Sequence, residues 1–298
     1  MRSFKEYNPV TVAFYYITVA VFSMFTMNPV LHLMTFLGGI IQFSVIKAEK
    51  KKETHMFFVG LGIILALVRP IFNHNGATVL FVLNDNPITA EAFIYGVSAA
   101  VMVVGVLYLF RVFSVIMTGD RLLYMFARLS PKTALVMSMG LRYIPLLRRK
   151  SREIKDAQTA IGINRDDNPI DRIKAALNVF SATVSWGLEN GIITADSMAS
   201  RGYGSHKRSC FKAYRFLGSD IIIIILIVML GVLPAVASAS GSFATEFYPR
   251  FSMRSHSVLT VAGYISFGML MLIPVITDLI ADIRWRRLIS KVPAAYRS

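Results

Sequence analysis

The chain has almost no cysteine and little charge for its length. Its single cysteine, Cys210, has no second thiol in the chain to pair with, so an internal disulfide is excluded. Only 16% of the residues are charged, whereas 55% are hydrophobic and the mean hydropathy is +0.56. Soluble domains typically carry about 25% charged residues. This composition argues against a soluble enzyme and predicts an integral membrane protein.

Motifs for catalysis and for metal binding are also missing. The sequence contains no GxxxxGK[ST] loop for nucleotide phosphates, no HExxH and no CxxC. The five histidines are scattered along the chain, which argues against a shared metal site. We therefore expect no catalytic residue, no metal site and no cofactor. A membrane-embedded enzyme stays as a less favoured alternative, because the apolar segments offer no converging catalytic set.

Long stretches lack charge altogether. Residues 7–46 contain no Asp, Glu, Lys or Arg, and this length is about twice the roughly 20 residues of one bilayer crossing. The turn dipeptide Asn28-Pro29 divides the stretch and predicts helices at 10–27 and 29–46. Further spans are expected at 56–73, 88–116, 219–239 and 257–282. Backbone groups in hydrocarbon must be bonded within their own segment, so we predict an all-α polytopic membrane protein with about six transmembrane helices.

Lysine and arginine mark one side of the membrane. They cluster at residues 47–52 and 284–291, whereas residues 76–88 contain none. The positive-inside rule places both clusters and both termini in the cytoplasm. The expected location of the protein is the inner or plasma membrane. Arg250 and Arg254, in an expected external loop, are a minor exception. Three regions are expected: transmembrane helices one to four in 1–116, a cytoplasmic helical region in 117–217, and helices five and six with a basic tail in 218–298.

The region 117–217 carries 17 Lys and Arg residues and 8 Asp and Glu residues. The positive-inside rule or an acidic protein partner explains this charge better than nucleic acid does. Two amphipathic helices are predicted here, one over 131–160 and one that opens at Pro169. In the second helix, apolar residues recur at three- and four-residue steps at Ile173, Leu177, Phe180, Val184 and Leu188. The pair of helices indicates a docking site for another protein. The alternative interpretation is that the region is a solvated charged loop.

The second amphipathic helix ends in Ser200-Arg201-Gly202. Glycine provides a helix stop, and the arginine before it projects five donors from the helix end. Such an arginine suits an acidic groove on another protein. It could equally cap its own helix and interact with the helix dipole, so the local residues leave both interpretations open.

Charges at the ends of the apolar segments are expected to be structural. Arg69 is expected to anchor the interface or to pair with Glu91. Asp278 and Asp282 lie one turn apart beside Arg284, and local ion pairing is the favoured interpretation.

Four further stretches complete a recognisable order of elements: residues 76–81 (GATVLF), 88–92 (ITAEA), 128–131 (RLSP) and 141–147 (LRYIPLL). Over about residues 1–240 the chain resembles the transmembrane T component of energy-coupling factor (ECF) transporters, the EcfT/CbiQ family. In that family two cytoplasmic coupling helices each end in an Ala-Arg-Gly-type motif, and each arginine docks on one of two ATPase subunits. The resemblance implies a non-catalytic scaffold that transmits ATPase motion to a small membrane-embedded substrate-capture subunit for uptake of a vitamin or a transition-metal ion.

The resemblance also implies roles for particular residues. The ATPase-coupling residues would lie at the two helix ends: Ser200, Arg201 and Gly202 at one, and Ala160, Gly162 and Arg165 at the other. At the latter end Ile161 stands where the family has arginine, and Arg165, one turn further on, is the candidate substitute. Apolar residues of the second coupling helix would contact the first one and the capture subunit: Ile173, Leu177, Phe180 and Val184.

Alternative functions stay open. A conventional ABC importer permease presents a short EAA-type coupling loop, which residues 156–162 (DAQTAIG) resemble faintly, but two extended amphipathic helices argue against it. A nonspecific cationic membrane or nucleic-acid binder is favoured least. The implied partners are two ABC-type ATPases, a capture subunit and the lipid bilayer, without nucleic acid. The substrate is not encoded here, because the capture subunit selects it in such systems.

Overall fold

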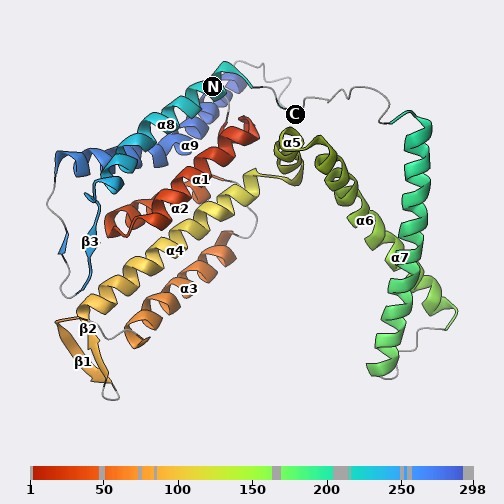
Figure 1. Cartoon of the computed structure of the whole chain (residues 1–298), viewed down its shortest axis with the longest axis horizontal. Helices are drawn as coiled ribbons and strands as arrows, with labels where there is room; N and C mark the ends of the chain where they lie inside the picture. Colours follow the sequence, from red (N-terminus) through yellow and green to blue (C-terminus); the bar gives the residue numbers. More distant parts are fainter. Residues whose placement is uncertain are drawn as a thin grey trace. The chain divides into compact units, whose positions relative to one another are not determined.

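A computed structural model of the 298-residue chain describes residues 3–46, 51–72, 76–83, 86–162, 169–203, 214, 216–248, 252–253 and 257–290. The chain divides into two compact units, drawn in Figure 1. The membrane unit comprises Met1–Leu122 and Tyr214–Ser298, and the second unit comprises Leu123–Ala213. Each unit is described by itself.

The membrane unit consists mainly of apolar helices. Among the described residues, four helices are long and apolar enough to cross a bilayer: α3 (Lys51–Phe72), α4 (Ala90–Ile116), α8 (Gly218–Ala239) and α9 (Val258–Ser290). Two are shorter, α1 (Pro9–Phe25) and α2 (Pro29–Val45), and a 3₁₀ helix, η1 (Phe4–Glu6), precedes them. The prediction of an all-α polytopic membrane fold is confirmed. At 17 residues each, α1 and α2 are about 26 Å long against a hydrocarbon layer of about 30 Å, so six full crossings stay a prediction.

The hairpin between α1 and α2 forms where the sequence predicted it. Asn28 caps α2 by accepting a hydrogen bond from the Val30 N–H at 3.0 Å, and Pro29 occupies the first helical position. The amide of Asn28 also donates to the Phe243 carbonyl (3.2 Å) and to the Tyr264 hydroxyl (2.8 Å). The turn is therefore tied to the segment between α8 and α9 and to α9 itself.

Helix α4 lies between α2 and α3 (Figure 1) and packs closely on both. Glycines make this approach possible. A Cβ atom at Gly105 would lie 2.9 Å from the backbone nitrogen of Phe36 in α2, and one at Gly96 would lie 2.8 Å from the Ala66 carbonyl oxygen in α3. Close approach of backbones at small residues is a common way for membrane helices to associate.

A polar group buried among the apolar helices joins α1, α2 and α9. The side-chain amide of Gln42 donates to the Tyr15 hydroxyl at 2.9 Å and to the Met271 carbonyl at 3.0 Å. Its oxygen accepts from the Tyr16 hydroxyl at 3.3 Å. The Tyr15 hydroxyl also donates to the Met271 carbonyl at 3.4 Å, so the buried groups form one connected network.

The charged side chains of Asp278, Arg69 and Glu91, at the ends of the apolar helices, contact residues other than the expected ones. Asp278 accepts hydrogen bonds from the Ser3 hydroxyl (2.6 Å) and the Phe4 N–H (2.7 Å), so it fixes the N-terminal segment instead of forming a local ion pair. The Arg69 guanidinium lies over the Tyr95 ring, 4.9 Å from its centroid. Glu91 accepts hydrogen bonds from the backbone N–H and hydroxyl of Thr78. The Arg69–Glu91 pairing alternative is therefore wrong.

Two small antiparallel sheets were not anticipated. Strands β1 (Val79–Leu83) and β2 (Asn86–Thr89) pair where a loop was expected, and β3 (Thr245–Glu246) pairs with β4 (Ser252–Met253). Ile88, predicted to begin the fourth span, belongs to β2. The helix begins later because the Thr89 hydroxyl caps α4 by accepting a hydrogen bond from the Ala92 N–H at 3.3 Å.

Some helix boundaries also differ from the predicted ones. Helix α3 already includes Lys51, before the predicted start at 56, because the lysines and the glutamate of this charged turn are good helix formers. Helix α9 continues to Ser290 instead of ending at 282. The amphipathic helices of the second unit are α6 (Pro131–Ala160) and α7 (Pro169–Ser200), as expected. An additional helix, α5 (Gly119–Leu129), spans the boundary between the units.

Candidate docking site on the crossed helices of the second unit

Helices α6 and α7 cross near their middles. Gly187 leaves room for Leu147, whose Cδ2 atom would lie 3.2 Å from a Cβ at position 187. On one side of this point the Tyr143 and Thr194 hydroxyl oxygens lie 3.0 Å apart. Tyr143 precedes Leu147 in α6, whereas Thr194 follows Gly187 in α7. The two helices are therefore antiparallel where they cross.

From the crossing to its C-terminal end, each helix has an arm of the same length. Ile161 follows Leu147 by 14 residues, and Arg201 follows Gly187 by 14 residues, which is about 21 Å of helix in each case. Because the chain directions are opposite, the two helix ends lie at opposite ends of the second unit (Figure 1). We call the turn at 160–162 the first tip and the turn at 200–202 the second tip.

The two tips have the same backbone geometry. Gly162 has φ +78° and Gly202 has φ +70°, the left-handed conformation that commonly ends a helix. The Gly162 N–H donates to the carbonyl three residues earlier at 3.0 Å, and the Gly202 N–H does so at 2.9 Å. The N–H groups of Ile161 and Arg201 each donate four residues back at 3.2 Å. The two side chains are therefore presented at equivalent turns, and both are exposed.

The other predicted coupling residues surround these two side chains. The Ser200 hydroxyl donates to the Asp196 carbonyl at 2.9 Å, so it is directed back along its own helix. Ala160 and Gly162 are exposed. Arg165 lies outside the described residues. Within the described part of the chain, the Arg201 guanidinium makes no hydrogen bond or ion pair, which leaves its donors available to a partner.

The predicted apolar stripe of α7 is largely exposed and does not form the closest contact with α6. Ile173, Leu177 and Phe180 are more than half exposed, whereas Val179 and Thr183 are only 8% and 9% exposed. Together with Gly187, these two residues form the strip of α7 that packs inside the unit, because small side chains let the helices approach. The spacing of Val179, Thr183 and Gly187 at four-residue steps was the available signal in the sequence. Contact of the large apolar residues with a capture subunit stays a prediction.

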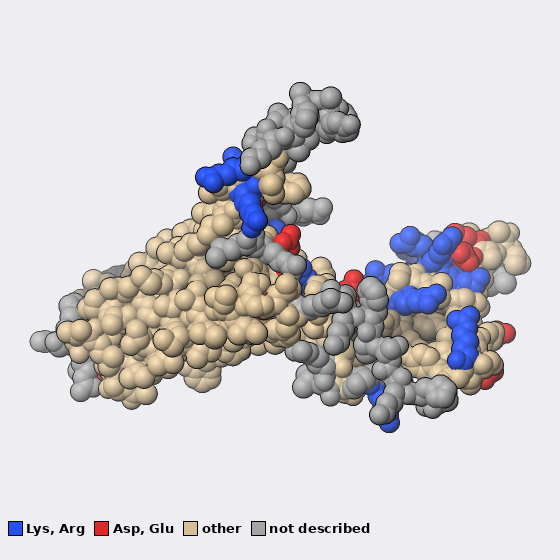
Figure 2. Space-filling model, turned by 90° about the horizontal axis from the view of Figure 1, so that it is seen from above, with Lys and Arg blue, Asp and Glu red and all other residues tan. Residues whose placement is uncertain are grey.

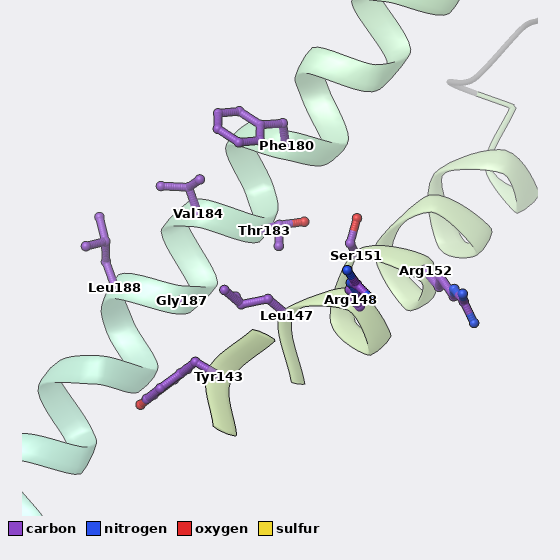
Figure 3. A pocket seen from close by; sticks show the side chains of 10 residues that line it. All are labelled: Tyr143, Leu147, Arg148, Ser151, Arg152, Phe180, Thr183, Val184, Gly187 and Leu188. Atoms are coloured by element: carbon purple, nitrogen blue, oxygen red, sulfur yellow. The ribbon is translucent and has the colours of Figure 1, made fainter. Parts of the chain in front are cut away.

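A groove of about 600 Å³ lies between the two helices. Figure 3 shows Phe180, Val184 and Leu188 pointing to the same side of α7, while α6 contributes Arg148 and Arg152. Because α6 also contributes Tyr143, Leu147 and Ser151, the surface of the groove is mainly apolar. Among the described residues, no three His, Cys, Asp or Glu side chains are arranged to hold a metal ion.

Basic side chains gather on the second unit, where they appear blue in Figure 2. Part of this charge is locally compensated, since Glu153 pairs with Arg149 at 3.6 Å and with Lys150 at 3.1 Å. Exposed pairs of this kind contribute little to stability, roughly 0–1 kcal/mol. Arg148, Arg152 and Arg201 have no acidic partner among the described residues, so the unit presents excess positive charge.

The apolar helices and the basic, amphipathic helix pair define a multi-pass membrane protein with a second, helical unit. The family model for "Cobalt transport protein" (CbiQ) matches residues 2–210, and the chain belongs to this family of membrane transporter components. The match covers α1 to α7 and ends before α8.

Relatives carry the name "Energy-coupling factor transporter transmembrane protein EcfT". The protein of Streptococcus equi is 26% identical over 189 residues, which cover 58% of this chain and 69% of that protein. The proteins of Bacillus subtilis and Exiguobacterium sibiricum are each 29% identical over 102 residues, or 34% of this chain. The chain spans only 38% and 39% of the length of these two relatives.

Proposed function

We propose that this chain is the transmembrane scaffold and coupling subunit of an ECF importer. It transmits the motion of two ABC-type ATPases to a small substrate-capture membrane subunit during uptake of a vitamin or a transition-metal ion. The chain performs no catalysis, because its partners hydrolyse ATP. The observation that carries the proposal is the crossed pair of helices with equal arms and matching tips, and the family and the names of the relatives support it.

The crossing explains how motion is transmitted. Each tip occupies one ATPase, so closing of the ATPase pair pulls the two tips toward each other. The arms are stiff helices, and the motion therefore becomes a rotation about the contact between Leu147 and Gly187. The hydrogen-bonded Tyr143 and Thr194 keep the helices together during this rotation. The exposed stripe around Phe180 moves with α7 and shifts the capture subunit that lies against it.

The placement of charge supports the proposed orientation. Residues 117–217 form the cytoplasmic coupling-helix region, both termini lie in the cytoplasm, and the protein resides in the inner or plasma membrane. A conventional permease presents a short coupling loop, whereas α6 and α7 have 30 and 32 residues. Their length favours the ECF arrangement.

Charge reversal at the second tip is expected to release the ATPases. Arg201→Glu places a carboxylate against an acidic groove, and unfavourable charge placement at a buried site costs several kcal/mol. The tagged protein is captured from detergent-solubilised native membranes, and its partners are quantified by mass spectrometry. Arg286→Glu makes the same charge change at an exposed position of α9 and serves as the control.

The unaltered chain is expected to capture two ABC-type ATPases and one small hydrophobic membrane protein, whose identity would reveal the substrate class. Arg201→Glu should insert into the membrane normally and lose the ATPases. Recovery of the unaltered chain alone would return the membrane-enzyme alternative to consideration. Undiminished ATPase capture by Arg201→Glu would contradict the docking role of the second tip.

A further inference from the structure

The exposed side of α9 ends in a pair of arginines. Apolar residues follow one another along this side at three- and four-residue steps, and each is between 39% and 52% exposed: Leu272, Ile276, Ile280 and Ile283. One further step of four reaches Arg287, and Arg284 lies three residues before it. Residues three apart are neighbours on a helix surface. The two guanidinium groups can therefore approach the same ligand.

The arginine pair lies where α9 leaves its apolar stretch. From Val258 to Ala281 the only charged residue is Asp278, and its carboxylate binds Ser3 and Phe4 within the membrane unit. The Cα–Cβ bonds of an α-helix tilt toward its N-terminus, so side chains that follow the apolar stretch point back toward it. Long arginine side chains at the end of a membrane helix reach the bilayer interface in this way.

We propose that Arg284 and Arg287 together bind the phosphate of an anionic phospholipid at the end of α9. A guanidinium group forms paired hydrogen bonds with phosphate oxygens, and two such groups suit a headgroup with net negative charge. The acyl chains of the same lipid lie along the apolar side that ends at Ile283. Helix α9 lies outside residues 2–210, which the family model matches, and the inference does not depend on ATPase coupling.

The neighbouring Arg286 has a different charge environment. Asp282 precedes it by four residues, so the two side chains share one side of the helix and their opposite charges compensate each other. The positions three and four residues away from Arg284 and from Arg287 hold no acidic residue. Positive charge is therefore concentrated at the pair, and this asymmetry provides a matched control.

Trp285 lies within the same turn and serves as the probe. It is 65% exposed, and tryptophan is enriched at the level of the lipid headgroups. The chain has two tryptophans, so Trp186→Phe leaves Trp285 as the single one. The full-length variant is placed in nanodiscs of equal parts phosphatidylglycerol and phosphatidylcholine, with one of the two lipids brominated near the top of its acyl chains. Bromine quenches tryptophan fluorescence at short range, so quenching reports which lipid adjoins the turn.

Brominated phosphatidylglycerol is expected to quench Trp285 more strongly than brominated phosphatidylcholine. The relative binding constant should be about fivefold or higher, because a single basic residue near an anionic surface contributes about that factor. Equal quenching by the two lipids would overturn the inference, since the turn would then not select a charged headgroup. Absence of quenching by both would also overturn it, because the turn would then lie away from lipid.

Single substitutions in the same background test the role of the pair. Arg287→Gln should reduce the preference for phosphatidylglycerol about fivefold, while quenching by phosphatidylcholine persists and shows that α9 stays inserted. Arg286→Gln removes the same charge from the same turn and should keep most of the preference. An unchanged preference with Arg287→Gln would overturn the inference. So would equal losses in both variants, because general attraction between positive charge and an anionic bilayer would then explain the preference.

Discussion

The close contact between α2 and α4 predicts how much the substitution Gly105→Ala lowers the free energy of unfolding. An alanine methyl at this position would lie 2.9 Å from the backbone nitrogen of Phe36 and 3.1 Å from its Cα. Ordinary van der Waals contact begins at 3.4 Å, so the two helices must separate locally by about 0.5 Å. The obstacle is backbone, which cannot rotate away as a flexible side chain can.

The cost of Gly105→Ala follows from this separation. A radial gap of about 0.5 Å already forfeits roughly a quarter of each dispersion contact across the interface, and forcing extra volume into a packed core typically costs about 1–3 kcal/mol. Replacing glycine in a helix interior returns about 0.5–1 kcal/mol through helix propensity. We therefore expect Gly105→Ala to lower the free energy of unfolding by about 1–2 kcal/mol.

Gly268→Ala in α9 is the matched control, since no atom lies within 4 Å of its added Cβ. It retains the propensity gain without the overlap, so its difference from Gly105→Ala isolates the overpacking cost. Thermal unfolding of both purified variants in the same detergent is the assay. A difference of several degrees in the midpoint is expected, at about 2–4 °C per kcal/mol. Equal midpoints would refute the close contact of α2 with α4.

Two further predictions concern buried polar groups. Gln42→Leu should lower the unfolding midpoint by an amount corresponding to about 1–3 kcal/mol, because it removes the acceptor of the buried Tyr16 hydroxyl and a donor to the Tyr15 hydroxyl; an unchanged midpoint would contradict this. Asp278→Ala should free the Phe4 N–H and accelerate trypsin cleavage after Lys5. Asp282→Ala, which removes an exposed carboxylate one turn on, is the control, and equal cleavage rates in both variants would argue against the N-terminal anchor.

The sequence predicted those parts of the fold that depend on the length, charge or capping residues of a single segment. The uncharged stretch 7–46 needed two helices because of its length, and Asn28-Pro29 located their junction, since asparagine caps and proline begins a helix. Strands β1 and β2 were not predicted, because residues 79–83 become a strand only by pairing with residues 86–89, and one apolar segment does not reveal that pairing. Helix α5 was not predicted, although apolar residues recur at helical spacing at 122, 123, 126 and 129.

Partners that are distant in the sequence could not be predicted in the same way. Asp278 was expected to pair with a charge in its own helix, since neighbours within one turn are visible in a sequence. Its actual partners, Ser3 and Phe4, lie more than 270 residues away. Arg69 likewise lies on the ring of Tyr95 and not beside Glu91. Each helix added to the bundle brings more side chains that could contact a given charge, and amino-acid composition does not show which of them does so.

The apolar stripe of α7 shows why the docking site was only partly predictable. Periodicity identifies the largest apolar residues, and in a chain that folds alone these would be the buried ones. In α7 the internal contact uses Val179, Thr183 and Gly187, which are smaller, while Phe180 and Leu188 are exposed. Exposing large apolar side chains is unfavourable in water, and this exposure is the reason for proposing that a partner subunit covers them. In α7 the small residues therefore identify the closest contact inside the chain, and the largest apolar residues do not.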